Sequence, residues 1–216
     1  MDLLHQILDI VLHLDVHLNE WATTLGPWLY VLLFVVIFCE TGLVVTPFLP
    51  GDSLLFAVGA LASLPDSPLS VPLLVGVMSV AAILGDATNY AIGHTVGPMV
   101  FRSERSRLLN PEHLARTQRF YERYGGKTIF LARFVPIVRT FAPFVAGIGR
   151  MRYGYFATWN VTGALVWVLS VGGAGYVFGQ VPLVKRNFEI VVLAIIALSL
   201  APMGVEYLRA RRNAMA

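Results

Sequence analysis

Four charged residues lie in stretches that are otherwise apolar: Glu40, Asp52, Arg133 and Arg139. Each costs at least about 2.5–3.5 kcal/mol to place at the centre of a membrane helix, so such residues are usually paired or functional. Two arginines in a low-dielectric cavity suit a phosphate group, because the guanidinium fork matches phosphate bidentately. Two buried carboxylates suit proton binding, because burial favours their neutral form. These residue types predict a proton-linked anion carrier, and two buried ion pairs that hold the protein together are the structural alternative.

The composition indicates an integral membrane protein. Of the 216 residues, 56% are apolar and 13% are charged, whereas an average soluble domain is about 25% charged. A soluble domain of this size could not bury so much apolar surface. The net charge of +3 and the long apolar blocks argue against nucleic-acid binding. The single cysteine, Cys39, excludes an internal disulfide, and His94 has no histidine partner at metal-ligand spacing, so we expect no metal and no cofactor.

Apolar length predicts the membrane spans. A span needs about 20 mostly apolar residues, and three segments meet this length: 72–99, 153–180 and a last span at 187–208. Residues 2–20 and 111–124 are amphipathic and could lie flat in the headgroup region, although a packed surface helix is nearly as good an interpretation.

Two further apolar stretches are interrupted by prolines. Pro47, Pro50 and Gly51 interrupt residues 28–63, and Pro136 and Pro143 interrupt residues 128–149. Proline removes a backbone donor and clashes with the preceding turn, and broken backbone at membrane depth survives only when it is buried in protein or lines a wet cavity. We interpret both stretches as re-entrant helical hairpins. Their breaks would bring the two acids together and let both arginines face one cavity.

The order of these elements predicts a single all-α transporter domain over residues 1–216 that contains an inverted repeat. The first repeat, 1–101, holds the 28–63 hairpin and one span. The second, 102–180, holds the 128–149 hairpin and another span. One crossing in the first repeat inverts the second, as in many secondary transporters.

The distribution of basic residues predicts the orientation. Residues 1–101 contain no Lys or Arg, and all 16 basic residues lie in 102–216. By the positive-inside rule the loop 102–127 and the tail 209–216 face the cytoplasm. Lys185 and Arg186 are an exception, because they would lie outside.

Polar residues within the spans are weaker signals. Asp86 and Asn89 lie on one face of the 72–99 span, and Asn160 lies on the 153–180 span. We expect Asn89 and Asn160 to form interhelical hydrogen bonds. For Asp86, packing and function are about equally good interpretations.

Three ordered motifs together resemble a known family, the DedA membrane proteins, whose superfamily is named for SNARE-associated Golgi proteins. The first motif is Phe38-Cys39-Glu40-Thr41-Gly42 followed by residues 47–52, and the second is Gly85-Asp86 with Asn89, Tyr90 and Gly93. The third runs from Phe130 through Arg133, Pro136 and Arg139 to Thr140, with Pro143, Gly147 and Met151 behind it. The resemblance covers nearly the whole chain.

This resemblance implies a multi-pass protein of the bacterial inner membrane that returns a polyprenyl phosphate, undecaprenyl phosphate in particular, across the membrane for reuse in cell-envelope synthesis. It implies a flippase in which Arg133 and Arg139 bind the phosphate and Glu40 and Asp52 couple transport to protons. Asp86, Asn89, Gly51 and the prolines of the breaks would support them. The implied partners are the lipid, protons and surrounding membrane lipids, and a homo-oligomer is left open.

Three other functions compete with this one. A proton-coupled carrier of a small ion or osmolyte would use the same acids but needs no arginine pair. A protein of envelope homeostasis without transport would tolerate loss of the charges. A lipid phosphatase is disfavoured, because within the predicted spans the only histidine is His94 and the aspartates do not cluster.

Overall fold

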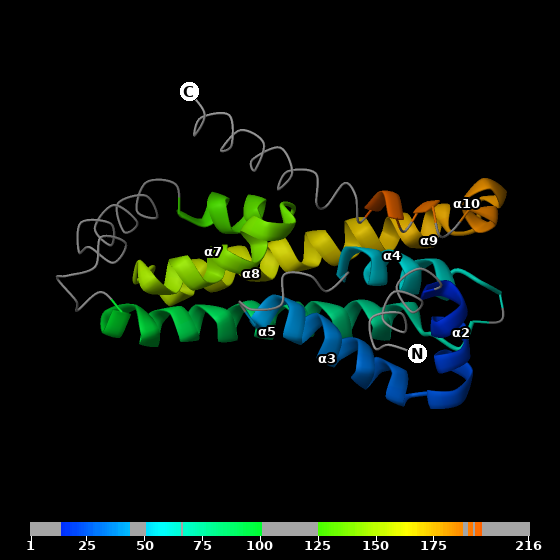
Figure 1. Ribbon diagram of the computed structural model, residues 1–216, viewed down its shortest axis with the longest axis horizontal. Helices are drawn as coiled ribbons and strands as arrows, with labels where there is room; N and C mark the ends of the chain where they lie inside the picture. Colours follow the sequence, from blue (N-terminus) through cyan, green and yellow to red (C-terminus); the bar gives the residue numbers. More distant parts are fainter. Residues whose placement is uncertain are drawn as a thin grey trace, which may run out of the picture. The chain divides into compact units, whose positions relative to one another are not determined.

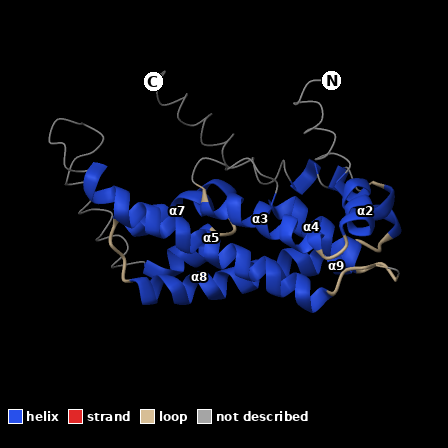
Figure 2. Ribbon diagram, turned by 90° about the horizontal axis from the view of Figure 1, so that it is seen from below, coloured by secondary structure: helices blue, strands red, loops and turns tan. Residues whose placement is uncertain are grey.

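A computed structural model describes residues 14–43, 51–65, 67–100, 125–187, 190–191 and 193–195. Every regular element in these residues is a helix (Figure 2). The all-α prediction is therefore confirmed for the described part of the chain.

The helices follow one another along the chain as labelled in Figure 1. Their bounds are α2 Leu14–Leu25, α3 Trp28–Gly42, α4 Gly51–Ala62, α5 Val71–Val100, α7 Pro136–Ile148, α8 Tyr153–Trp167, the π-helical η1 Val168–Gly172, α9 Gly173–Phe178 and α10 Pro182–Arg186. Residues 125–132 are also helical.

Two helical stretches are long and apolar enough to cross a membrane, Val71–Val96 and Tyr153–Phe178. They correspond to the predicted spans at 72–99 and 153–180. The second stretch runs through α8, η1 and α9 without leaving a helical conformation. Most of the predicted last span at 187–208 lies outside the described residues, as do the segment 111–124 and all of 2–20 before α2.

Both predicted hairpins contain a break between helices. In the first, α3 ends at Gly42 and α4 begins at Gly51; Pro47 and Pro50 lie outside the described residues. In the second, helix 125–132 ends before a turn at 133–135, and α7 begins at Pro136. Val135 is extended there, with φ −117° and ψ 104°, because the proline ring disfavours a helical conformation in the residue before it.

Pro143 does not interrupt the second stretch. It lies inside α7, which continues to Ile148, so the expectation of a break at this proline was wrong. A membrane helix tolerates an internal proline because neighbouring groups satisfy the carbonyl that loses its donor. Pro136 differs because it occupies the first position of a helix, where no backbone donor is needed.

The described residues divide into two compact units, each built from separate parts of the sequence. The first unit comprises those within Met1–Leu33, Pro50–Val77 and Val168–Ala216. The second comprises those within Phe34–Leu49 and Met78–Trp167. Each unit draws on both predicted repeats, and the inverted repeat itself stays a prediction.

In the first unit, α4 packs against α9, η1 and α2. Glycines permit this close approach: a Cβ atom on Gly59 would collide with the backbone of Gly172, and one on Gly175 with the backbone of Phe56. Eleven of the twelve residues of α4 are buried. The apolar helix α4 is therefore a central element of this unit.

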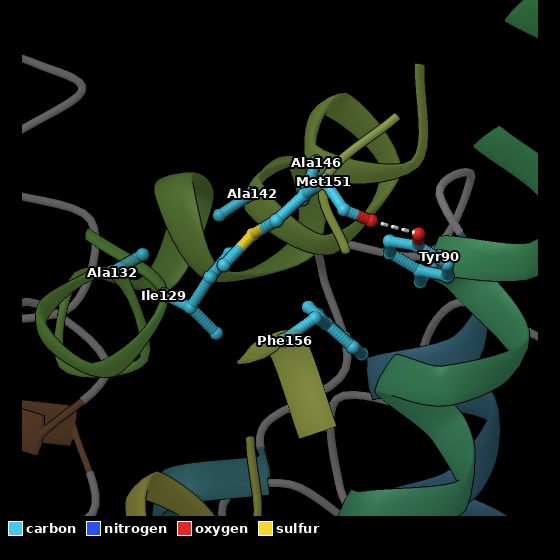
Figure 3. Close-up of a cluster of buried hydrophobic side chains, with 7 residues drawn as sticks. All are labelled: Tyr90, Ile129, Ala132, Ala142, Ala146, Met151 and Phe156. Atoms are coloured by element: carbon cyan, nitrogen blue, oxygen red, sulfur yellow. Dashed lines mark hydrogen bonds between the residues drawn. The ribbon is translucent and has the colours of Figure 1, made fainter. Parts of the chain in front are cut away.

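In the second unit, part of α5 packs against α7, α8 and helix 125–132. Figure 3 shows the apolar cluster where they meet, which consists of Tyr90, Ile129, Ala132, Ala142, Ala146, Met151 and Phe156. The Tyr90 hydroxyl donates to the Met151 carbonyl. Small residues again bring backbones together, since a Cβ atom on Gly147 would meet the Tyr90 carbonyl. This packing holds α7, and the turn before it, in place beside α5.

Candidate functional site

The second unit contains a buried cluster of four charged side chains, Glu40, Asp86, Arg133 and Arg139, each no more than 6% exposed. All four were named as site residues from the sequence, Asp86 only as a supporting one, and the structure brings them into one unit. The cluster has equal numbers of acids and bases.

Glu40 lies in the last turn of α3, where the helix crosses α5. Gly42 and Gly85 make the crossing possible, because a Cβ atom on Gly42 would come within 3.2 Å of the Gly85 Cα. Glu40 Oε1 lies 3.2 Å from Arg139 Nη2. Close backbone contact at the two glycines thus holds the carboxylate inside the protein.

Arg139 lies in the first turn of α7, where its backbone N–H donates to the Val135 carbonyl at 2.9 Å. Its guanidinium carbon lies 4.5 Å from the ring centroid of Trp167. A guanidinium over an indole face is attracted by the quadrupole of the ring. Arg139 is therefore held by Glu40 and by an aromatic face.

Arg133 lies in the turn between helix 125–132 and α7, so it depends on the break at Pro136. Its Nη2 donates to the Asp86 carboxylate and to Asn160 Oδ1, the latter at 2.7 Å. The Asn160 amide in turn donates to the Ile83 carbonyl at 3.0 Å. Arg133 therefore joins the turn to α5 and α8.

One donor of Arg133 stands out. Within the described part of the chain, the buried Nη1 has no hydrogen-bond partner. Leaving a buried charged donor unsatisfied costs free energy, and a guanidinium has five N–H groups to satisfy. This atom could hydrogen-bond to an anionic ligand.

Asn89 connects the two helices that carry the Glu40–Arg139 pair. Its side-chain amide, with no exposed surface, donates to the Thr41 carbonyl at 3.1 Å and to the Thr140 carbonyl at 2.7 Å. These carbonyls belong to the residues that directly follow Glu40 and Arg139. The expected interhelical hydrogen bonds of Asn89 and Asn160 are thus present.

The two ion pairs form one electrostatic system. Arg139 interacts with both Asp86 and Arg133, and Glu40 interacts with Arg133. Buried ion pairs contribute little net stability, because desolvation offsets the attraction. Because the four groups interact, a change in the charge of one member, by protonation or ligand binding, would alter the electrostatic energy of the other three.

The pairing of Arg133 with Asp86 was not predicted, although Asp86 was named as a supporting residue. The available signal was an acid in the middle of an apolar span, one turn before Asn89 on the same face. Trp167, the ring beside Arg139, was also missed as a site residue.

Asp52 belongs to the first unit. It lies in the first turn of α4, directly after the buried Gly51, and is itself half-buried. Its convergence with Glu40 stays a prediction. Among the described residues, no group of three or more His, Cys, Asp or Glu side chains could hold a metal ion.

Comparison with known proteins identifies the family. Residues 49–177 match the VTT domain. The chain is 53% identical to Protein DedA of Escherichia coli K12 over 214 residues, which cover 99% of this chain and 98% of that protein. The chain belongs to the DedA family. The resemblance noted from the motifs is therefore confirmed.

Two more distant relatives are named as membrane proteins. An uncharacterized membrane protein of Mycobacterium tuberculosis is 43% identical over 185 residues, 84% of this chain and 81% of that protein. Inner membrane protein YqjA of E. coli K12 is 31% identical over 182 residues, with the same coverage. No solved structure matches the chain. Together with the two apolar helices of spanning length, the relatives identify an integral membrane protein.

Proposed function

We propose that this DedA-family protein is a proton-linked transporter, or flippase, of a lipid phosphate in the bacterial inner membrane. Its substrate would be a polyprenyl phosphate such as undecaprenyl phosphate, recycled for cell-envelope synthesis. One observation carries the proposal: two buried arginines each lie against a buried carboxylate, and Nη1 of Arg133 has no hydrogen-bond partner among the residues that the structure describes.

The ion pairs suggest how protons and phosphate are coupled. When Glu40 takes up a proton it loses its charge, and Arg139 can then exchange the carboxyl group for a phosphate oxygen. Arg133 offers Nη1 to the same phosphate, and protonation of Asp86 would release Nη2 as well. Two guanidinium groups can then bind the phosphate in the bidentate geometry that they favour. Loss of the proton restores the ion pair and expels the anion.

Asp52 is proposed as a second proton-coupling residue beside Glu40. In this scheme the end of α3 at Gly42 and the turn at 133–135 allow the charged residues to reach the membrane interior from two re-entrant hairpins, 28–63 and 128–149. These hairpins would form the inverted repeat of 1–101 and 102–180, and the last span would lie at 187–208.

The proposed orientation places residues 102–127 and 209–216 in the cytoplasm. Cysteine substitution at position 105, in a protein whose Cys39 is replaced by serine, tests this orientation. A membrane-impermeant maleimide should label position 105 only after the cell membrane is permeabilised. Labelling in intact cells would reverse the orientation.

Reconstitution into liposomes tests the transport function. Labelled undecaprenyl phosphate should cross the bilayer faster with the protein than without it, and a pH gradient should change that rate. Glu40→Gln and Arg133→Gln should reduce the rate, whereas Thr88→Ala, a substitution on the same α5 helix as Asp86 that removes only a bond to the Leu84 carbonyl, should not.

Two results would contradict the proposal. If lipid crosses the bilayer at the same rate with and without the protein, while the protein takes up a small ion in a pH-dependent manner, the ion or osmolyte carrier is favoured. No transport of either kind, together with full activity of the charge variants in envelope growth, would favour a structural role.

A further inference from the structure

The first unit contains an apolar groove that the charge cluster does not explain. It has a volume of about 180 Å³ and lies between α4 and two segments of the spanning helices. Leu55 lines it from α4, Leu74 and Val75 from the start of α5, and Leu169 and Tyr176 from η1 and α9. Apart from the Tyr176 hydroxyl, the lining side chains carry no polar group, so the groove suits a hydrocarbon.

A glycine keeps the groove open. Gly173 lines it, and a Cβ atom built on Gly173 would meet nothing within 4 Å. Close packing therefore does not require glycine here, in contrast to Gly59, whose Cβ would collide with the Gly172 backbone. The π-helical turn Val168–Gly172 directly precedes Gly173 and forms part of the same wall. Such turns often occur at functional sites.

The surroundings of the groove determine what can fill it. Its walls include residues of both helices that are long enough to span the membrane, and Val177, which is one of the lining residues, is 65% exposed. On a spanning helix, exposed apolar surface faces lipid, so the groove is continuous with the lipid-facing surface. Apolar cavities of about 150 Å³ stay free of water and bind small hydrocarbons. With no charged lining residue, the groove has no means of selecting a headgroup.

We propose that this groove binds an acyl chain of a bilayer phospholipid as a resident lipid, separate from the transported molecule. An acyl chain is the hydrocarbon that the bilayer supplies in greatest amount, and the groove is lined by glycine and aliphatic side chains together with one tyrosine. The inference concerns only the first unit and does not depend on the proposed transport function.

Photo-crosslinking tests the site in the full-length protein. The protein is reconstituted into vesicles of phosphatidylethanolamine and phosphatidylglycerol that contain a phospholipid with a diazirine on its acyl chain. Crosslinked peptides are then identified by mass spectrometry. We expect crosslinks concentrated at residues 71–75 and 168–177.

Filling the groove should remove these crosslinks. Gly173→Leu places a side chain in open space and should lower their yield about tenfold, which corresponds to about 1.4 kcal/mol of lost binding. Gly173→Ala should give a smaller fall and serves if the leucine variant does not fold. Gly76→Leu is the matched control, because a Cβ on Gly76 also meets nothing within 4 Å but Gly76 does not line the groove.

Several results would overturn the proposal. One is an equal loss of crosslinks with Gly76→Leu, and another is an undiminished yield with folded Gly173→Leu and Gly173→Ala. A polyprenyl phosphate probe that displaces the phospholipid from these peptides would assign the groove to the transported lipid instead. With a photoreactive amino acid in place of Leu169 instead of the lipid probe, crosslinks to residues 187–208 or to a second copy of the chain would show that protein covers the groove.

Discussion

Replacing Asp86 by asparagine is expected to destabilise the folded protein by about 3 kcal/mol. Removing one partner of a buried ion pair costs about 3–5 kcal/mol, because the other charge is left uncompensated. Arg133 and Asp86 are 5% and 6% exposed, so water cannot replace the lost partner. The loss falls at the lower end of the range because Asn160 Oδ1 remains bonded to Arg133 and asparagine keeps a hydrogen-bond acceptor.

A double-mutant cycle measures this coupling directly. The free energy of unfolding is obtained by titrating the micelle-solubilised protein with a denaturing detergent. Asp86→Asn/Arg133→Gln should recover most of the stability lost in Asp86→Asn, since no buried charge then lacks a partner. Adjacent groups in one network typically couple by about 0.5–3 kcal/mol.

The result that refutes this reasoning is additivity. If Asp86→Asn and Arg133→Gln act independently, the ion pair seen in the structure does not stabilise the fold. The same cycle with Asp52→Asn in place of Asp86→Asn tests which acid pairs with Arg133. Coupling with Asp86 alone supports the pair found in the structure, and coupling with Asp52 supports the acid that the sequence emphasised. The double variant also separates stability from transport, because it should fold but fail to carry lipid phosphate.

Three further predictions concern the other members of the cluster. Arg139→Lys should weaken lipid-phosphate binding in nanodiscs, and Arg139→Ala should weaken it about ten- to hundredfold, the effect of losing a charge-assisted hydrogen bond worth about 1.5–3 kcal/mol. Glu40→Gln and Asp52→Asn should each abolish the pH dependence of transport in liposomes while the protein stays folded in the membrane. Asn89→Leu should lower stability by about 1–3 kcal/mol, because it removes the hydrogen bonds that the buried amide donates to the two carbonyl groups, whereas Thr88→Ala should change stability by less than about 0.5 kcal/mol.

Each of these predictions has a contradicting result. Unchanged lipid binding in Arg139→Ala, measured on folded protein, would remove that residue from the phosphate site. Full transport with unaltered pH dependence in both acid variants would leave those acids as structural partners. Equal stability of Asn89→Leu and Thr88→Ala would show that the bonds between α3, α5 and α7 contribute nothing.

The features that could be predicted from sequence are those set by local chemistry. Apolar length predicted the two spans, because a bilayer fixes how many residues a helix needs. The missing N–H of Pro136 predicted the break that holds Arg133. The cost of burying a charge singled out Glu40, Arg133 and Arg139 from the apolar residues around them.

The features that escaped prediction depend on contacts between distant segments. Hydropathy shows that Asp86 is buried, but not that α5 places it against the turn at Arg133. The same limit applies to Trp167. A tryptophan in an apolar helix is usually a core residue, and only the structure shows that a guanidinium lies over its ring. The tolerance of Pro143 within α7 escaped prediction for the same reason, because it depends on neighbouring groups that sequence spacing does not reveal.

The discontinuous make-up of the second unit has a consequence for biosynthesis. Synthesis begins at the N-terminus, and residues 1–101 contain no Lys or Arg, so Glu40 and Asp86 leave the ribosome before either partner exists. Arg133 follows Asp86 by 47 residues, and Arg139 comes later still. The first half of the chain therefore enters the membrane before these two acids can pair with Arg133 and Arg139. Insertion of this protein is complete only when its two halves have met.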